Sequence, residues 1–124
     1  MEDGDSKDAE SLLPAVLAVL DDPDCREILR VTTEPRTPSE IAELCDLPES
    51  TLYRKLNQLT TASLLRKQVK VDSETGQMTE YVRNFERVAV SMDDNGEFNI
   101  NVEKRERTAE DRLTDLWSKL GDEI

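Results

Sequence analysis

Residues 37–59, which read TPSEIAELCDLPESTLYRKLNQL, decide the fold, because two short helical patterns meet there at a three-residue turn. Thr37 and Glu40 have the spacing of a capping box, and Pro38 falls at the first helical position, where its missing N–H costs nothing. A helix is therefore predicted to begin here. Residues 45–47 form the turn that ends it, and a second helix follows directly.

The second helix of this pair combines an apolar stripe with a polar outer face. Its stripe consists of Leu52, Leu56 and Leu59. At about 100° per residue, the opposite face and its flanks carry Ser50, Thr51, Tyr53, Arg54, Asn57, Gln58 and Thr61. Short hydrogen-bond donors and a guanidinium group near the start of a helix suit base edges and phosphates in the DNA major groove. The pattern predicts a DNA-binding helix-turn-helix; a helical hairpin with a solvated face is the alternative interpretation.

A basic β-hairpin is predicted directly after this helix. Residues 64–71 have the pattern of a strand with three basic side chains, residues 72–76 form a turn that ends in glycine, and residues 77–83 return as a second strand. A hairpin that follows a recognition helix is the wing of a winged helix. We therefore expect an α+β, mainly α fold, with a winged helix-turn-helix over residues 11–84.

Three runs of residues resemble a known family. Residues 21–29 (DDPDCREIL), 37–42 (TPSEIA) and 47–56 (LPESTLYRKL) are similar to the winged helix-turn-helix transcriptional regulators of the ArsR-like type found in haloarchaea. The resemblance extends over roughly residues 12–83. It implies that the recognition helix and the base of the wing contact DNA, through Ser50, Thr51, Tyr53, Arg54 and Lys55 and through Arg66, Lys67 and Lys70. The chain has no histidine and no Cys-x-Cys pair on a recognition helix, so metal sensing is not expected.

The candidate DNA contacts divide by chemistry into two groups. Side chains near the start of the recognition helix are candidates for reading bases or contacting the groove wall: Ser50, Thr51, Tyr53 and Arg54. Basic side chains are candidates for phosphate contacts: Lys55, Arg66, Lys67 and Lys70. Ser39, at the start of the preceding helix, is a further candidate for contact with the DNA backbone.

The net negative charge of the chain opposes DNA binding, but this charge is unevenly distributed. The net charge is −12, yet residues 49–70 carry a local +4, which leaves −16 on the remaining residues. An acidic surface with few lysines is typical of proteins from a salt-saturated cytoplasm, so a halophilic source is expected. At molar salt the Debye length is about 3 Å, which screens repulsion between the acidic surface and DNA. The alternative is that the acidic surface itself is functional, as a mimic of nucleic acid or a docking surface for a basic partner.

The N-terminal residues predict an arm followed by helices. Residues 1–10 are too polar and acidic to pack and are expected to be a disordered arm. An apolar helix follows, and Asp22 with Pro23 begins another, whose Cys25, Ile28 and Leu29 share one face.

Residues 85–124 are expected to extend the same domain with a hairpin and a terminal helix. Strand patterns at 86–92 and 97–103 flank an Asn-Gly turn, and this hairpin either covers the core or forms a dimer or effector surface. The first and last helices expose more apolar surface than a small monomer readily hides, and both are expected to mediate dimerisation. The residues concerned are Leu12, Leu13, Val16, Leu17 and Leu20 in the first helix and Leu113, Leu116, Trp117 and Leu120 in the last.

Several classes of function find no support in the sequence. The chain lacks an imidazole base, a serine nucleophile with a matched base and a glycine-rich phosphate loop, so it is not expected to be an enzyme. Cys25 and Cys45 are interpreted as buried reduced thiols, with a redox sensor as the alternative, and two cysteines do not make a zinc site. No metal, cofactor or small-molecule ligand is expected. The longest apolar run has nine residues, against about 20 for a membrane helix, so a soluble cytoplasmic protein that does not bind membranes is predicted.

Together these patterns predict a regulator of transcription that binds double-stranded DNA. One recognition helix reads only a few base pairs, so a homodimer on a two-fold-related site is expected. The alternative is a winged helix used as a protein-interaction module of the transcription machinery or another assembly, without specific DNA reading.

Overall fold

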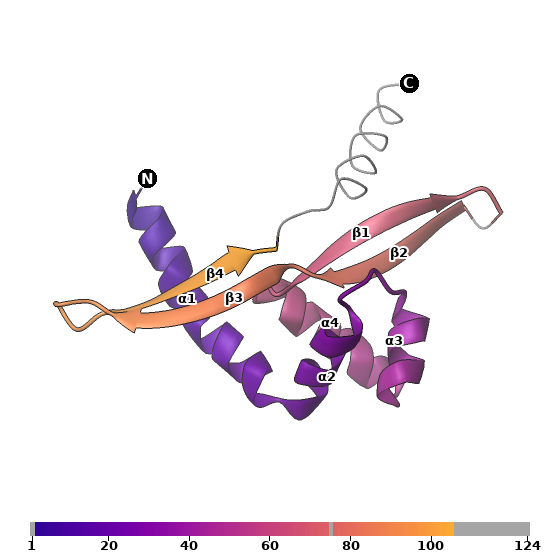
Figure 1. The fold of residues 1–124 in the computed structure, drawn as a ribbon, viewed down its shortest axis with the longest axis horizontal. Helices are drawn as coiled ribbons and strands as arrows, with labels where there is room; N and C mark the ends of the chain where they lie inside the picture. The colour runs from indigo at the N-terminus through magenta and orange to yellow at the C-terminus, as the bar shows by residue number, and fades with distance from the viewer. Residues whose placement is uncertain (1, 75, 106–124) are drawn as a thin grey trace, which may run out of the picture.

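A computed structural model describes residues 2–74 and 76–105, with side chains from residue 12 onward. Four helices are followed by two antiparallel hairpins in this part of the chain (Figure 1). The helices are α1 (Glu2–Asp21), α2 (Pro23–Val31), α3 (Pro38–Cys45) and α4 (Glu49–Thr61). The strands are β1 (Leu65–Asp72), β2 (Gly76–Arg83), β3 (Phe85–Met92) and β4 (Phe98–Lys104). The predicted α+β winged helix-turn-helix is confirmed.

Side-chain caps fix where α2 and α3 begin. Asp22 caps α2 by accepting a hydrogen bond from the Asp24 N–H at 2.9 Å. At α3 the predicted capping box is present: the Glu40 carboxylate accepts from the Thr37 N–H at 2.9 Å, and the Thr37 hydroxyl accepts from the Glu40 N–H at 3.2 Å. The helix ends at Asp46, whose φ of 54° turns the chain towards α4. The helix-turn-helix is thus specified by local hydrogen bonds.

The core lies where α2, α3 and α4 meet the base of the first hairpin. Its fully buried side chains include Ile28, Ile41, Leu52, Leu56, Leu59 and Leu64. A single β-bridge joins Arg36 to Tyr81 of β2: the Arg36 N–H donates to Tyr81 O at 3.0 Å, and the Tyr81 N–H donates to Arg36 O at 2.8 Å. The sheet formed by β1 and β2 is thereby anchored to the segment that leads into α3.

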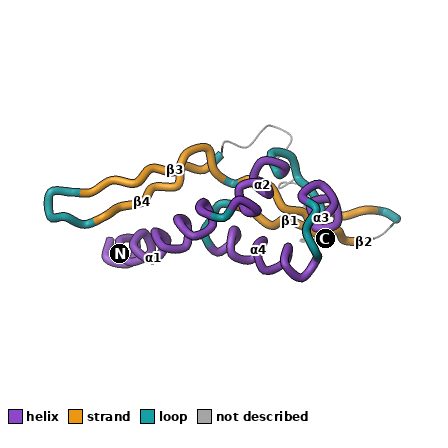
Figure 2. The backbone as a smooth tube through the Cα atoms, turned by 90° about the horizontal axis from the view of Figure 1, so that it is seen from below, coloured by secondary structure: helices purple, strands orange, loops and turns teal. Residues whose placement is uncertain are grey.

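The apolar face of α1 is covered by the same chain, which corrects part of the expected dimer interface. β4 and α4 pack against α1, and Figure 2 shows α1 running alongside the second hairpin. Val16 is fully buried in the core, and the half-buried residues packed against that core are Leu12, Leu13 and Leu20. The prediction of an interface role for Val16 is therefore wrong, because its side chain has no exposed surface in the described chain. Leu17 remains 51% exposed, and residues 113–120 lie outside the described residues.

The backbone of α1 is helical from Glu2, where the sequence predicted a disordered arm over residues 1–10. Two effects favour this extension. Acidic residues near a helix N-terminus interact favourably with the helix dipole, and a helix already held by packing adds one hydrogen bond for each further residue it orders. None of the described helices is both long enough and apolar enough to cross a membrane.

The second hairpin has the predicted register and turn. Val88 pairs with Val102, Val90 with Ile100 and Met92 with Phe98, so these apolar side chains share one face. Gly96 supplies the positive φ of the turn, at 82°. This face packs on α1 near the buried Ile100, whereas Val90, Met92 and Phe98 remain exposed. The hairpin therefore covers the core with part of its apolar face, as one of the two expected roles.

The two hairpins join at Asn84 and extend in opposite directions from the helices (Figure 1). The Asn84 N–H donates to Leu64 O at 3.0 Å, and the Arg105 N–H donates to Asn84 O at 3.3 Å. The Arg105 side chain also donates to Thr33 O at 2.6 Å. Both ends of the second hairpin are thus held at the base of the first.

Val16 and Leu17 are neighbours in α1 that provide a matched test of this packing. We expect Val16→Ala to lower the free energy of unfolding by roughly 1 to 3 kcal/mol, through lost burial and a residual cavity. Leu17→Ala, at a site that is 51% exposed in the described chain, should cost no more than about 0.5 kcal/mol if Leu17 contacts no partner chain. Urea unfolding of both variants at one protein concentration measures the difference. A larger loss for Leu17→Ala would show that α1 faces a partner chain through the Leu17 side.

Candidate nucleic-acid interface

The exposed face of α4 carries the polar side chains that the sequence assigned to it. Leu52, Leu56 and Leu59 are fully buried, so the opposite side of the helix faces solvent. The exposed side chains there are Ser50, Tyr53, Arg54, Asn57, Gln58 and Thr61, and Thr51 is half-buried. Ser39 is exposed in the first turn of α3. These side chains are free of the core and available to a ligand.

Lys55 differs from the other candidates, because its side chain is only 8% exposed. Its ammonium group donates a hydrogen bond to Asp22 Oδ2 and lies 3.7 Å from Asp24 Oδ2. The expected contact of Lys55 with DNA phosphates is therefore wrong for the described structure. The reason is helical geometry: Lys55 lies about 40° from Leu59 around the helix, on the buried side. The position of Lys55 on a helical wheel already predicts its burial, whereas its basic side chain suggested a contact with phosphate.

Asp22 connects three helices at this point. One carboxylate oxygen caps α2, while the other accepts hydrogen bonds from Lys55 and, at 3.6 Å, from the Cys25 thiol. The hydrogen bond from Lys55 lowers the pKa of Asp22 and raises the pKa of Lys55. Both shifts favour the charged forms, so the ion pair persists at neutral pH. The sequence predicted the cap but not this contact between α2 and α4.

The basic residues of the first hairpin lie on two faces. Side chains alternate along β1, so Leu65 and Lys67 share one face while Arg66 and Lys70 share the other. The face of Lys67 also carries Tyr81, which with Leu65 belongs to the core, so Lys67 lies on the side of the helices. Arg66, Lys67 and Lys70 were expected to contact phosphates together, but they do not all lie on the same face.

The two faces of this hairpin differ in charge beyond its base. On the side of Lys67 the described residues are Val69, Val71, Gln77 and Thr79, none of which is acidic. The side of Lys70 contains Glu80, which accepts a hydrogen bond from Gln68, and also Asp72. The helix-facing side is therefore the better surface for a polyanion.

Few basic side chains in the described part of the chain lack a partner. Most Arg side chains donate to a carboxylate or a backbone carbonyl, and Lys55 is paired with Asp22. Within residues 12–74 and 76–105, the Lys and Arg side chains without a hydrogen bond or ion pair are Arg54, Lys67, Lys70 and Lys104. Three of these four belong to α4 and the first hairpin. The unpaired positive charge is thus concentrated on the surface that the sequence assigned to DNA.

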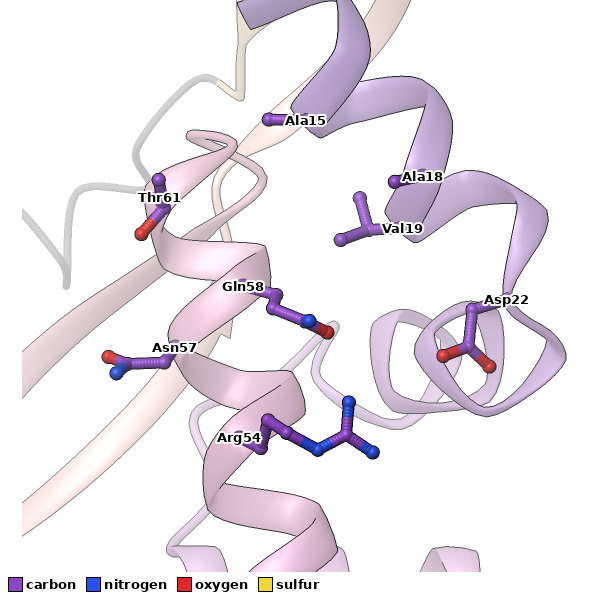
Figure 3. Close-up of a pocket in the computed structure, with 8 residues that line it drawn as sticks. All are labelled: Ala15, Ala18, Val19, Asp22, Arg54, Asn57, Gln58 and Thr61. Atoms are coloured by element: carbon purple, nitrogen blue, oxygen red, sulfur yellow. The ribbon is translucent and has the colours of Figure 1, made fainter.

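A cleft of about 540 Å³ separates α4 from α1 (Figure 3). Ala15, Ala18 and Val19 line it from α1, with Asp22 at the end of that side. The side of α4 contributes Arg54, Asn57, Gln58 and Thr61. In Figure 3 the Arg54 side chain extends across the cleft towards the α1–α2 corner that contains Asp22.

The two cysteines have the environment of unreactive thiols. Cys25 is fully buried, and burial together with the nearby Asp22 raises its pKa to about 11. Cys45 is half-buried, and its pKa is raised mainly by burial. Both are free, and at neutral pH both remain protonated, the less nucleophilic form. The described residues also contain no group of three or more His, Cys, Asp or Glu side chains arranged to hold a metal ion.

Comparison with known proteins supports the assignment of a helix-turn-helix domain. Residues 20–68 match the family model of a helix-turn-helix domain, a type of domain that is characteristic of DNA-binding regulators. The match runs from the end of α1 to the first half of β1 and includes all of α2, α3 and α4. No curated protein matches the chain.

Proposed function

We propose that this chain is a transcriptional regulator that binds duplex DNA through α4 and the β1–β2 wing. The observation that carries the proposal is the set of unpaired cations, Arg54, Lys67 and Lys70, on one helix and one hairpin. In a chain with 28 acidic and 16 basic residues, carboxylate partners are abundant. Basic side chains that remain unpaired in such a chain are available for phosphates and base edges.

Two kinds of contact follow from the chemistry of this surface. Ser50, Thr51, Tyr53 and Arg54 would face the major groove and read base edges or contact its walls. Lys67, with Arg66, Lys70 and Ser39 as further candidates, would contact phosphates and fix the position of the domain on DNA. The acidic remainder of the surface fits the ArsR-like regulators of salt-loaded cells that the sequence resembles, where ionic screening limits repulsion.

The competing function is a winged-helix module that binds protein. The exposed apolar side chains of the second hairpin, Val90, Met92 and Phe98, favour it. It differs from the first proposal in needing no nucleic acid, so enrichment of bound fragments from random DNA in molar potassium distinguishes the two. Enrichment of a defined motif supports DNA reading, and recovery of no DNA supports the protein-interaction module.

Arg54→Ala tests base reading by α4. Loss of a bidentate contact with a base should weaken binding to the selected site by about 1 to 3 kcal/mol. The matched control is Arg87→Ala, which removes an exposed arginine of β3 that is paired with Glu103. Anisotropy titrations with labelled DNA in molar potassium measure both. Equal losses in the two variants would mean that Arg54 contributes only general charge.

Lys67→Ala and Lys70→Ala test which face of the wing meets DNA. Lys67→Ala should weaken binding to all sequences alike and reduce the slope of log affinity against log salt by about one phosphate contact. Lys70→Ala should have a smaller effect, because Glu80 and Asp72 share its face. Lys104→Ala removes another unpaired lysine, on β4, and should leave both quantities unchanged. A larger effect of Lys70→Ala than of Lys67→Ala would assign the DNA to the opposite face.

The regulator is further proposed to act as a homodimer on a two-fold-related site. Two α4 helices one DNA turn apart, about 34 Å, would combine short half-sites into one specific operator. The candidates for the interface are Leu17, exposed on α1, and the C-terminal residues Leu113, Leu116, Trp117 and Leu120.

Light scattering in molar potassium tests this assembly. The parent should have twice the chain mass of 14.1 kDa. Trp117→Asp and Leu17→Asp should each produce monomers, because a two-fold interface repeats every substituted charge. Affinity for the complete operator should then fall towards that for one half-site. A parent mass of one chain would contradict the dimer and leave DNA binding by the monomer to be judged from the titrations.

A further inference from the structure

We propose that Lys55 is a positioning residue that keeps Arg54 available for DNA by neutralising Asp22. This inference rests on the proposed DNA-binding function and gives a buried lysine of the recognition helix a role without any contact to nucleic acid. Its basis is the arrangement of two neighbouring basic residues around one carboxylate.

The carboxylate of Asp22 is required by the fold, although it lies beside a surface proposed to bind a polyanion. It caps α2 through the Asp24 N–H and receives the Cys25 thiol. Its side chain is 27% exposed and lines the cleft between α1 and α4. An uncompensated negative charge here would repel phosphates and attract any nearby cation.

Arg54 is the unpaired cation on the other side of this cleft. Its side chain extends towards the α1–α2 corner (Figure 3), and it forms no ion pair with any described residue. Asp22 already accepts the hydrogen bond of Lys55, which approaches from the buried side of α4. The neighbouring Asp24 carboxylate also lies 3.7 Å from the Lys55 ammonium group. One buried cation thus compensates Asp22, the carboxylate that lines the cleft with Arg54, and also lies near Asp24.

Removal of the Lys55 charge changes this balance. Asp22 and Asp24 then lose the cation that pairs with them. The guanidinium of Arg54 is the other basic group of α4. An arginine held by a carboxylate must break that pair before it can bind a base, so DNA affinity falls although no DNA contact was removed. The same loss should disappear when the charge of Asp22 is removed as well.

The experiment compares Lys55→Met, Asp22→Asn and the double variant with the parent in DNA titrations at several potassium concentrations. Lys55→Met should bind the selected site about tenfold more weakly, the scale of one lost base contact, with an unchanged salt slope. Asp22→Asn retains a capping oxygen and should bind like the parent. The double variant should recover affinity to within about twofold of the parent, because no charge remains on Asp22 to hold Arg54.

Two results would overturn the proposal. A salt slope reduced by one contact in Lys55→Met, without rescue by Asp22→Asn, would show that Lys55 binds phosphate directly. Weak binding of both Lys55→Met and the double variant, with an unchanged slope, would show that the pair only fixes the angle of α4. If Lys55→Met does not fold, Lys55→Gln, which is uncharged but retains a donor for Asp22, replaces it in the same comparisons.

A measurement without DNA separates this inference from the proposed function. The NMR signal of the Arg54 side-chain Nε–H should shift in Lys55→Met and return in the double variant. If the parent binds no DNA, the DNA-binding proposal fails, while this signal still reports whether Asp22 captures Arg54. If DNA binds and the Arg54 signal is unaffected by Lys55→Met, the capture mechanism is excluded.

Discussion

Burial of one face of α4 is the constraint on which the rest of the structure depends. Leu52, Leu56 and Leu59 have no exposed surface, and α1, α2, α3 and β1 all contact this helix. A helix enclosed on that many sides keeps a single free face. The packing of the buried face therefore determines how the free face of α4 is oriented. Short loops connect α4 to α3 and to β1. A ligand of this face would meet side chains on a helix already held by packing, so no ordering of the α4 backbone would accompany its binding.

The abundance of carboxylates makes the distribution of cations the main electrostatic feature of this chain. Arg87 is paired with Glu103, and Arg30 with Glu27, on exposed surfaces where such pairs contribute little stability. These pairs leave no unpaired cation at Arg30 or Arg87. Buried Lys55 performs a related task inside the molecule, where it offsets a helix cap. Charge pairing thus leaves most of the unpaired positive charge of the described residues on α4 and the first hairpin.

The sequence predicted what local rules determine. The capping box at Thr37, the apolar stripe of α4 and the Asn-Gly register of the second hairpin all depend on residues close together in the chain, and all three were confirmed. The errors concern contacts between distant residues. Val16 is buried in the same core as Ile100, which belongs to a strand that begins more than 80 residues later, and Lys55 is paired with a residue 33 positions earlier. Alternation along one strand already places Lys67 and Lys70 on opposite faces, but which of the two faces lies on the side of the helices required the pairing of Lys67 with Tyr81.

The two hairpins share one junction, at Asn84. A single residue separates β2 from β3, and its backbone is bonded both to Leu64, which follows α4, and to Arg105, which follows β4. The two hairpins point away from this residue in opposite directions (Figures 1 and 2). Backbone hydrogen bonds at the same three residues therefore hold both the first hairpin, which follows α4, and the second, which packs on α1. In the proposed complex with DNA, the span between α4 and the first hairpin would therefore be set at a junction that also holds the second hairpin.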